Sequence, residues 1–183
     1  AVPHDPTEEG AWVSDAGHRD AVLLALGLVP FAAIAFLWFI GVIRSHIGRR
    51  EDQFFSTVLL GSGIVFVASL YASVALEVAG VVEVQRGRPE ALESVRLAFD
   101  ASYVLAYVFA AKMAGAFMAV FTTMLIRLAQ PPRWLTILGY IGALMLLFTI
   151  PRVEWLLLVF PLWVLVVSIQ ILRDSLFETQ DAV

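Results

Sequence analysis

The chain has 183 residues and a formal net charge of −4; 60% of its residues are hydrophobic and only 15% are charged. A small soluble domain must cover a large surface with polar groups, so this many apolar side chains must instead face lipid. The absence of cysteine excludes disulfides, thiol catalysis and thiolate metal sites. The acidic balance, with no basic stripe, excludes nucleic acid as a partner.

The chain opens with a polar segment. Residues 1–20 contain Pro3, Pro6 and Gly10, which predicts an extracytoplasmic N-terminal arm that is ordered only by packing on a neighbour. The chain starts at Ala1 without methionine, so we expect that a leader was removed or that an earlier segment precedes it.

Five apolar stretches follow and predict an all-α membrane domain, a transmembrane bundle over residues 21–173 with a cytoplasmic tail at 174–183. The expected spans are Ala21–Ile43, Phe54–Leu76, Ala101–Ile126, Trp134–Ile150 and Trp155–Leu172. The last two are separated by a proline and two charges, which would be expensive in lipid, so we expect a tight hairpin there.

The connection between the second and third spans has a helical pattern of its own. Pro89 suits the first turn of a helix, and Leu92, Val95 and Phe99 then recur at helical spacing with charged residues between them. We therefore expect a short amphipathic helix at the membrane surface, which can run straight into the third span.

The positively charged flanks predict the orientation. With the N-terminus outside, the inner side receives Arg44, Arg49, Arg50, Arg127, Arg133 and Arg173. The outer side receives Arg19, Arg86, Arg88, Arg96 and Arg152. Short loops weigh most in this rule, and the two short inner loops are basic. The prediction is a multi-pass protein of the plasma (inner) membrane with a cytoplasmic C-terminus.

Lys112 is the only charged residue within the five predicted spans. It lies near mid-membrane, where a lysine costs on the order of 2.5–3.5 kcal/mol on insertion scales. Its long stem can carry the amine to the headgroups, or it can form an ion pair with Glu77 or with another subunit. It can also line an ion or substrate path, with Tyr103 and Tyr107 above it on the same helix.

Small residues recur at four-residue spacing on two spans. Ala111, Gly115 and Ala119 lie four apart on the third span, and Ala68 and Ala72 do so on the second. Such spacing lets membrane helices approach closely and predicts helix packing. Because Lys112 is next to Ala111, this pattern favours a lysine that points into protein.

No catalytic or cofactor constellation is present. His4, His18 and His46 all lie outside the spans, which excludes a buried bis-histidine haem site. Ser62 stands between two glycines without a base placed to activate it. We therefore expect no catalytic residue, no cofactor and no metal, and a protein that is not an enzyme.

Four short segments carry a resemblance: Ala35–Arg44, Leu97–Asp100, Pro131–Leu135 with Gly139, and Phe160–Leu165. On these the chain resembles a broad family of uncharacterised bacterial multi-pass membrane proteins, over most of its length. The resemblance implies a bundle of five to six spans, often with a further span before the polar segment. Lys112 departs from the family, whose helix is usually apolar there.

These observations predict a non-catalytic integral membrane subunit that stabilises or regulates a larger complex, such as a respiratory or transport assembly. Its expected partners are the lipid bilayer and other membrane subunits. The alternative is a small transporter or channel for an anion or a lipid, with Lys112 lining the path. A lipid-modifying enzyme ranks last, because Glu77 is the only carboxylate near enough to act within the membrane.

Overall fold

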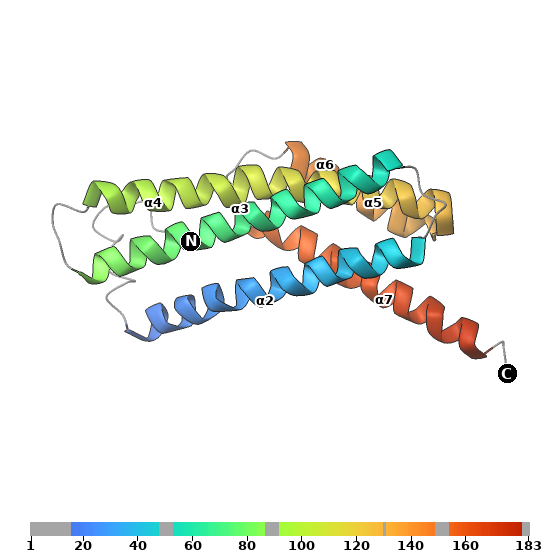
Figure 1. The fold of residues 1–183 in the computed structure, drawn as a ribbon, viewed down its shortest axis with the longest axis horizontal. Coiled ribbons are helices and arrows are strands. Elements are labelled where there is room, and N and C mark those ends of the chain that lie inside the picture. Colours follow the sequence, from blue (N-terminus) through green and yellow to red (C-terminus); the bar gives the residue numbers. More distant parts are fainter. Residues whose placement is uncertain (1–15, 48–52, 87–91, 130, 149–153, 181–183) are drawn as a thin grey trace. The chain divides into compact units, whose positions relative to one another are not determined.

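The computed structural model describes residues 16–47, 53–86, 92–129, 131–148 and 154–180. These residues are helical almost throughout and contain no β-strand, which confirms the all-α helical bundle (Figure 1). In chain order the elements are α2 (Ala16–Ile47), α3 (Gln53–Gln85), α4 (Leu92–Val104), the π-helix η3 (Leu105–Ala110), α5 (Ala111–Ala129), α6 (Arg133–Phe148), the 3-10 helix η4 (Glu154–Leu158) and α7 (Val159–Gln180).

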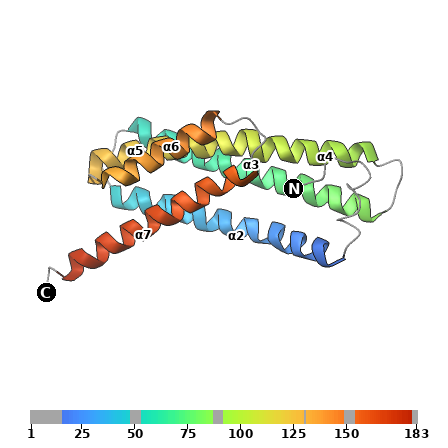
Figure 2. The ribbon, with the colours of Figure 1, turned by 180° about the vertical axis from the view of Figure 1, so that it is seen from behind.

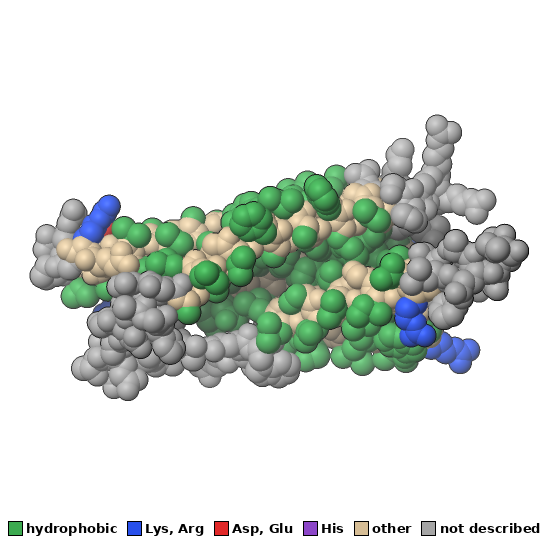
Figure 3. All heavy atoms as spheres, turned by 90° about the horizontal axis from the view of Figure 1, so that it is seen from below, with side chains coloured by type: hydrophobic (Ala, Val, Ile, Leu, Met, Phe, Trp, Pro, Cys, Tyr) green, Lys and Arg blue, Asp and Glu red, His purple; other side chains and the backbone are tan. Residues whose placement is uncertain are grey.

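Four helices of the described part are long and apolar enough to cross a membrane: Ala21–Ile43, Phe54–Gln85, Leu92–Arg127 and Leu156–Arg173. The remaining predicted span, Trp134–Ile150, begins within the shorter apolar helix α6 (Arg133–Phe148), and its last two residues lie outside the described part of the chain. On the face seen in Figure 3, hydrophobic side chains cover the helices and the Lys and Arg side chains lie near helix ends. The chain is therefore a helical membrane protein.

The predicted surface helix is not a separate element. α4, η3 and α5 follow one another without a break, so this helix runs directly into the third span (Figure 1). Pro89 and the predicted hairpin at 151–153 lie outside the described residues, as does the N-terminal arm up to residue 15. The last five residues of the predicted N-terminal arm, 16–20, belong to α2. Residues 174–180 of the predicted cytoplasmic tail continue α7.

The chain divides into two units, one of residues 1–48 and 63–110 and the other of 49–62 and 111–183. In the first unit, α2 and α3 run antiparallel. The Tyr71 hydroxyl donates to the Pro30 carbonyl at 3.3 Å, and the rings of Phe36 and Phe66 meet edge to face with centroids 5.4 Å apart. In this antiparallel pairing, the numbers of two residues that lie opposite each other on α2 and α3 add up to about 101.

In the second unit, α5, α6 and α7 lie side by side (Figure 2). Phe117 and Phe121 of α5 meet Phe160 and Trp163 of α7 edge to face, at 5.9 and 5.4 Å between ring centroids. All four rings are buried. Edge-to-face pairs of this kind add about 0.5–1.5 kcal/mol each beyond the area they bury.

Glycines allow α6 to approach its neighbours closely. A Cβ on Gly142 would lie 2.5 Å from Cε of Met118, and a Cβ on Gly139 would collide with the Thr122 hydroxyl oxygen. Because lipid tails are as apolar as the helices, such close van der Waals contact is a main source of helix association in membranes.

The Gly139–Thr122 contact gives a test of this packing. Gly139→Ala should destabilise the chain by about 1–3 kcal/mol, because the new methyl group overpacks a filled contact. Thr122→Ala should recover most of that loss in the double variant, since it removes the colliding atoms. Circular dichroism during unfolding in mixed detergent gives the free energy of unfolding of wild type, of each single variant and of the double variant.

The matched control is Gly27→Ala, because nothing lies within 4 Å of a Cβ at that position. It should leave stability unchanged or raise it slightly, as alanine is the better helix former. Equal losses at Gly27 and Gly139 would show that the Thr122 contact is not what requires glycine.

Candidate intramembrane polar site

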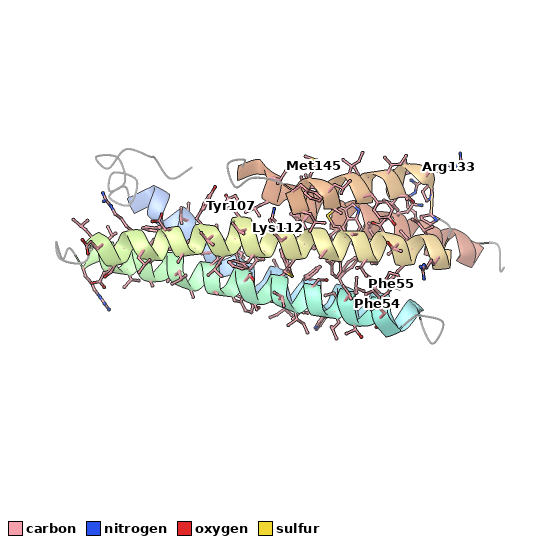
Figure 4. All side chains as sticks on the ribbon, turned by 90° about the horizontal axis from the view of Figure 1, so that it is seen from above. Phe54, Phe55, Tyr107, Lys112, Arg133 and Met145 are labelled. Carbon is pink, nitrogen blue, oxygen red and sulfur yellow. The ribbon has the colours of Figure 1, made fainter. Side chains whose placement is uncertain are left out.

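Lys112 lies in the second unit, near the start of α5, and is half-buried. Its ammonium donates a hydrogen bond to the main-chain carbonyl of Leu146, at 3.3 Å. In Figure 4 the side chain projects towards α6 on the side where Met145 lies, while Arg133 lies at the opposite end of α6. The lysine thus meets the C-terminal end of α6.

The position of this carbonyl explains why a cation suits it. Leu146 lies in the last turn of the described part of α6, and the C-terminal side of a helix carries a partial negative charge. The N-terminal end of α6 holds Arg133 and Trp134, residues typical of a membrane interface. The carbonyl gives the ammonium an acceptor, which lowers the cost of a charge within an apolar helix.

Glu77 lies in the first unit and has a different partner. The hydroxyl of Ser102 on α4 donates to Glu77 Oε1 at 3.0 Å. The hydroxyl of Ser73, one turn before Glu77 on α3, lies 2.9 Å from Ser102 Oγ and donates to the Ser102 carbonyl at 3.0 Å. Ser102 is 1% exposed and Ser73 is 4% exposed, so the two hydroxyls form a buried polar link between α3 and α4.

The third predicted residue, Tyr107, is half-buried in η3, and its ring stacks on that of Tyr103 with centroids 4.5 Å apart. Lys112 belongs to one unit and Glu77 and Tyr107 to the other. The structure therefore describes each polar group within its own unit, Lys112 with the Leu146 carbonyl and Glu77 with the Ser102 hydroxyl.

The small residues of α5 lie as follows. Ala111 is buried and Ala119 is half-buried, with its carbonyl accepting a hydrogen bond from the Thr123 hydroxyl at 2.8 Å. A Cβ on Gly115 would lie 2.9 Å from Leu147 Cγ and 3.0 Å from the Ala143 carbonyl oxygen. Gly115 is therefore the position of closest approach between α5 and α6 near Lys112.

Two functional side chains escaped sequence reasoning. Ser73 and Ser102 were not singled out, although Ser73 stands four residues before Glu77 and must share its helix face. This spacing was an available signal for Ser73. Nothing in the sequence marked Ser102, because its pairing with α3 depends on the helix register.

Arg127 lies at the end of α5 that is far from Lys112. Its guanidinium lies over the Phe55 ring, at 4.5 Å from the ring centroid. A cation–π contact of this kind contributes about 0.5–1 kcal/mol at an exposed site. Figure 4 shows Phe54 and Phe55 near the start of α3.

Within the described ranges, no group of three or more His, Asp or Glu side chains is placed to hold a metal ion. No protein-family description, curated protein or solved structure matches this chain.

The Lys112–Leu146 hydrogen bond is tested by Lys112→Met. The variant loses a charge-assisted bond of about 1.5–3 kcal/mol but also the cost of burying an ammonium, roughly 2.5–3.5 kcal/mol, so global stability should change little. The local effect should be clear. The last turn of α6 loses a cap and should fray, seen as faster hydrogen exchange in peptides covering residues 143–150.

Lys112→Arg is the matched variant, because it keeps a cationic donor and should keep the protection of wild type. If exchange in the last turn of α6 is unchanged in Lys112→Met, the lysine does not hold that end of the helix.

Proposed function

We propose that this protein is a non-catalytic integral membrane subunit that stabilises or regulates a larger membrane complex. The observation that carries the proposal is the exposed face of α3. Along that face four alanines recur at three- and four-residue spacing, Ala68, Ala72, Ala75 and Ala79, beside the larger exposed residues Ile64, Val65 and Tyr71. All four alanines are exposed, within a helix that is apolar over the length of a span.

The contrast with the other spans makes this face distinctive. The exposed side chains of α2 include Leu24, Leu28, Phe31 and Trp38, and those of α7 include Leu162, Leu165 and Ile169. Large side chains of this kind suit contact with lipid tails. Small residues at this spacing instead suit a second helix, because they let two backbones approach closely and gain van der Waals contact.

The environment of Lys112 supports a structural rather than a conducting role for that residue. Its ammonium donates to the Leu146 carbonyl, so the side chain links α5 to α6. This weakens the main argument for a transporter or channel, which depended on Lys112 as a group lining the path.

We further propose that the complex lies in the plasma (inner) membrane with the C-terminus in the cytoplasm. Arg127 ends the apolar segment of α5 and Arg133 begins α6, so this short connection is positively charged. Positive short loops stay on the cytoplasmic side, which supports an N-terminus outside.

The test is isolation from native membranes in mild detergent, followed by native electrophoresis and mass spectrometry of co-migrating chains. Wild type should migrate with fixed partners. The double variant Ala68→Leu with Ala72→Leu should reduce their yield about tenfold, the change produced by a loss of about 1.4 kcal/mol in association. The added side chains hold the partner helix away.

Ala32→Leu on α2 is the control, because Ala32 is also exposed but is flanked at four-residue spacing by the large residues Leu28 and Phe36. It should leave partner yield unchanged. A wild-type protein that runs only as a monomer or homo-oligomer would overturn the subunit proposal.

A further inference from the structure

Glu77 is placed in an apolar part of the first unit. The α2–α3 register puts it level with Leu24, since it lies six residues beyond Tyr71 and Leu24 lies six residues before Pro30. Leu24 is within the apolar segment Ala21–Ile43 and is 69% exposed, as a lipid-facing residue should be. On its own helix, Glu77 is followed by five uncharged residues before Glu83.

The ring of Phe99 packs beside the half-buried Glu77, towards the end of α3. This ring, on α4, lies over Gly80, where a Cβ would be 3.1 Å from the ring atom Cζ. Gly80 is about one turn beyond Glu77, so the Phe99 ring contacts the next turn of α3. Any larger residue at Gly80 would displace this ring.

The hydrogen-bond network around Glu77 can be completed in two ways. With an ionised carboxylate, the Ser102 hydroxyl donates to Glu77 Oε1 and the Ser73 hydroxyl donates to the oxygens of Ser102. With a protonated carboxyl group, Glu77 donates to Ser102 Oγ and Ser102 donates to Ser73 Oγ. Ser73 then donates to the Ser102 carbonyl, and every hydroxyl hydrogen again has an acceptor.

We propose that Glu77 is a proton-binding site within the membrane, and that Ser102 and Ser73 form a reversible relay which satisfies the carboxyl group in both protonation states. Such a relay matters in lipid, where no water replaces a missing partner. Proton uptake from water converts the carboxylate to a neutral acid and reverses the direction in which the Ser102 hydroxyl donates. This site stands on its own geometry and does not depend on the proposed subunit role.

The charged residues nearest to Glu77 lie on α3, α4 and α2. On α3, Glu83 is engaged by Arg86 at 2.9 Å. On α4, Arg96 and Asp100 have exposed side chains. On α2 the nearest charged positions are Arg19 and Asp20, which precede the apolar segment. Among the described residues, Ser102 is the one that hydrogen-bonds to the Glu77 carboxylate.

Carbodiimides test the proposal in vesicles of phosphatidylcholine, because they add to protonated carboxyl groups and the adduct is located by peptide mass mapping. The apolar reagent dicyclohexylcarbodiimide should modify Glu77, and the yield should fall as the pH is raised. Glu83 is the internal control: it should react with a water-soluble carbodiimide instead. Modification of Glu77 by the water-soluble reagent only, or a yield independent of pH, would overturn the proposal.

Sodium ions separate a proton site from a metal-cation site. At constant pH and ionic strength, replacing choline by sodium should leave the labelling of Glu77 unchanged. Protection by sodium would show that the oxygens bind that ion and would overturn the assignment to a proton.

Variants test the relay itself. Ser102→Ala should change the pH dependence of Glu77 labelling, because it removes the hydroxyl that bonds to Glu77 Oε1. Ser73→Ala should change it less, because Ser73 bonds to Ser102 and not to Glu77. Glu77→Gln should abolish the label while circular dichroism shows a folded chain. An unchanged pH dependence in Ser102→Ala would rule out the relay.

Discussion

A lysine in an apolar helix must find a hydrogen-bond acceptor, and in this protein that constraint links α5 to α6. The Lys112 ammonium meets it by donating to the main-chain carbonyl of Leu146, at 3.3 Å. A main-chain oxygen of the neighbouring helix thus offsets part of the cost of placing the charge there.

That arrangement requires α5 and α6 to stay close together. Gly115 lies next to the lysine's helix turn and admits Leu147 and Ala143 of α6, while Gly139 and Gly142 admit Thr122 and Met118 further along. The contacts proceed in opposite directions along the two helices, as in an antiparallel pair. Close packing therefore sets the distance across which the Lys112 side chain reaches the Leu146 carbonyl.

Most of the fold could be predicted from the positions and lengths of the apolar segments. Composition and segment length predicted the helical class, and the first predicted span, Ala21–Ile43, lies within the longer helix α2, Ala16–Ile47. They did not predict η3, because Leu105–Ala110 is ordinary apolar sequence and a π-helix arises from helix geometry rather than from a residue pattern. They also predicted a span at Trp134–Ile150, whose last two residues lie outside the described part of the chain.

The polar sites were predicted in part, for a similar reason. Charges in or next to a span are visible in the sequence, so Lys112 within the third predicted span and Glu77 at the end of the second stood out at once. Their partners were not visible, because Leu146 acts through its backbone and Ser102 acts through its register with α3. An ion pair between opposite charges is the simplest expectation from sequence, but hydroxyl and carbonyl groups are commoner than charges within membranes and are the partners that each site has here.

The two faces of α6 also have a consequence for the lipid around it. Ile137, Ile141 and Phe148 are exposed, whereas Gly139 and Gly142 are buried against α5. Branched and aromatic side chains therefore meet the acyl chains on one face, and the absence of side chains on the other brings the helix axis close to α5.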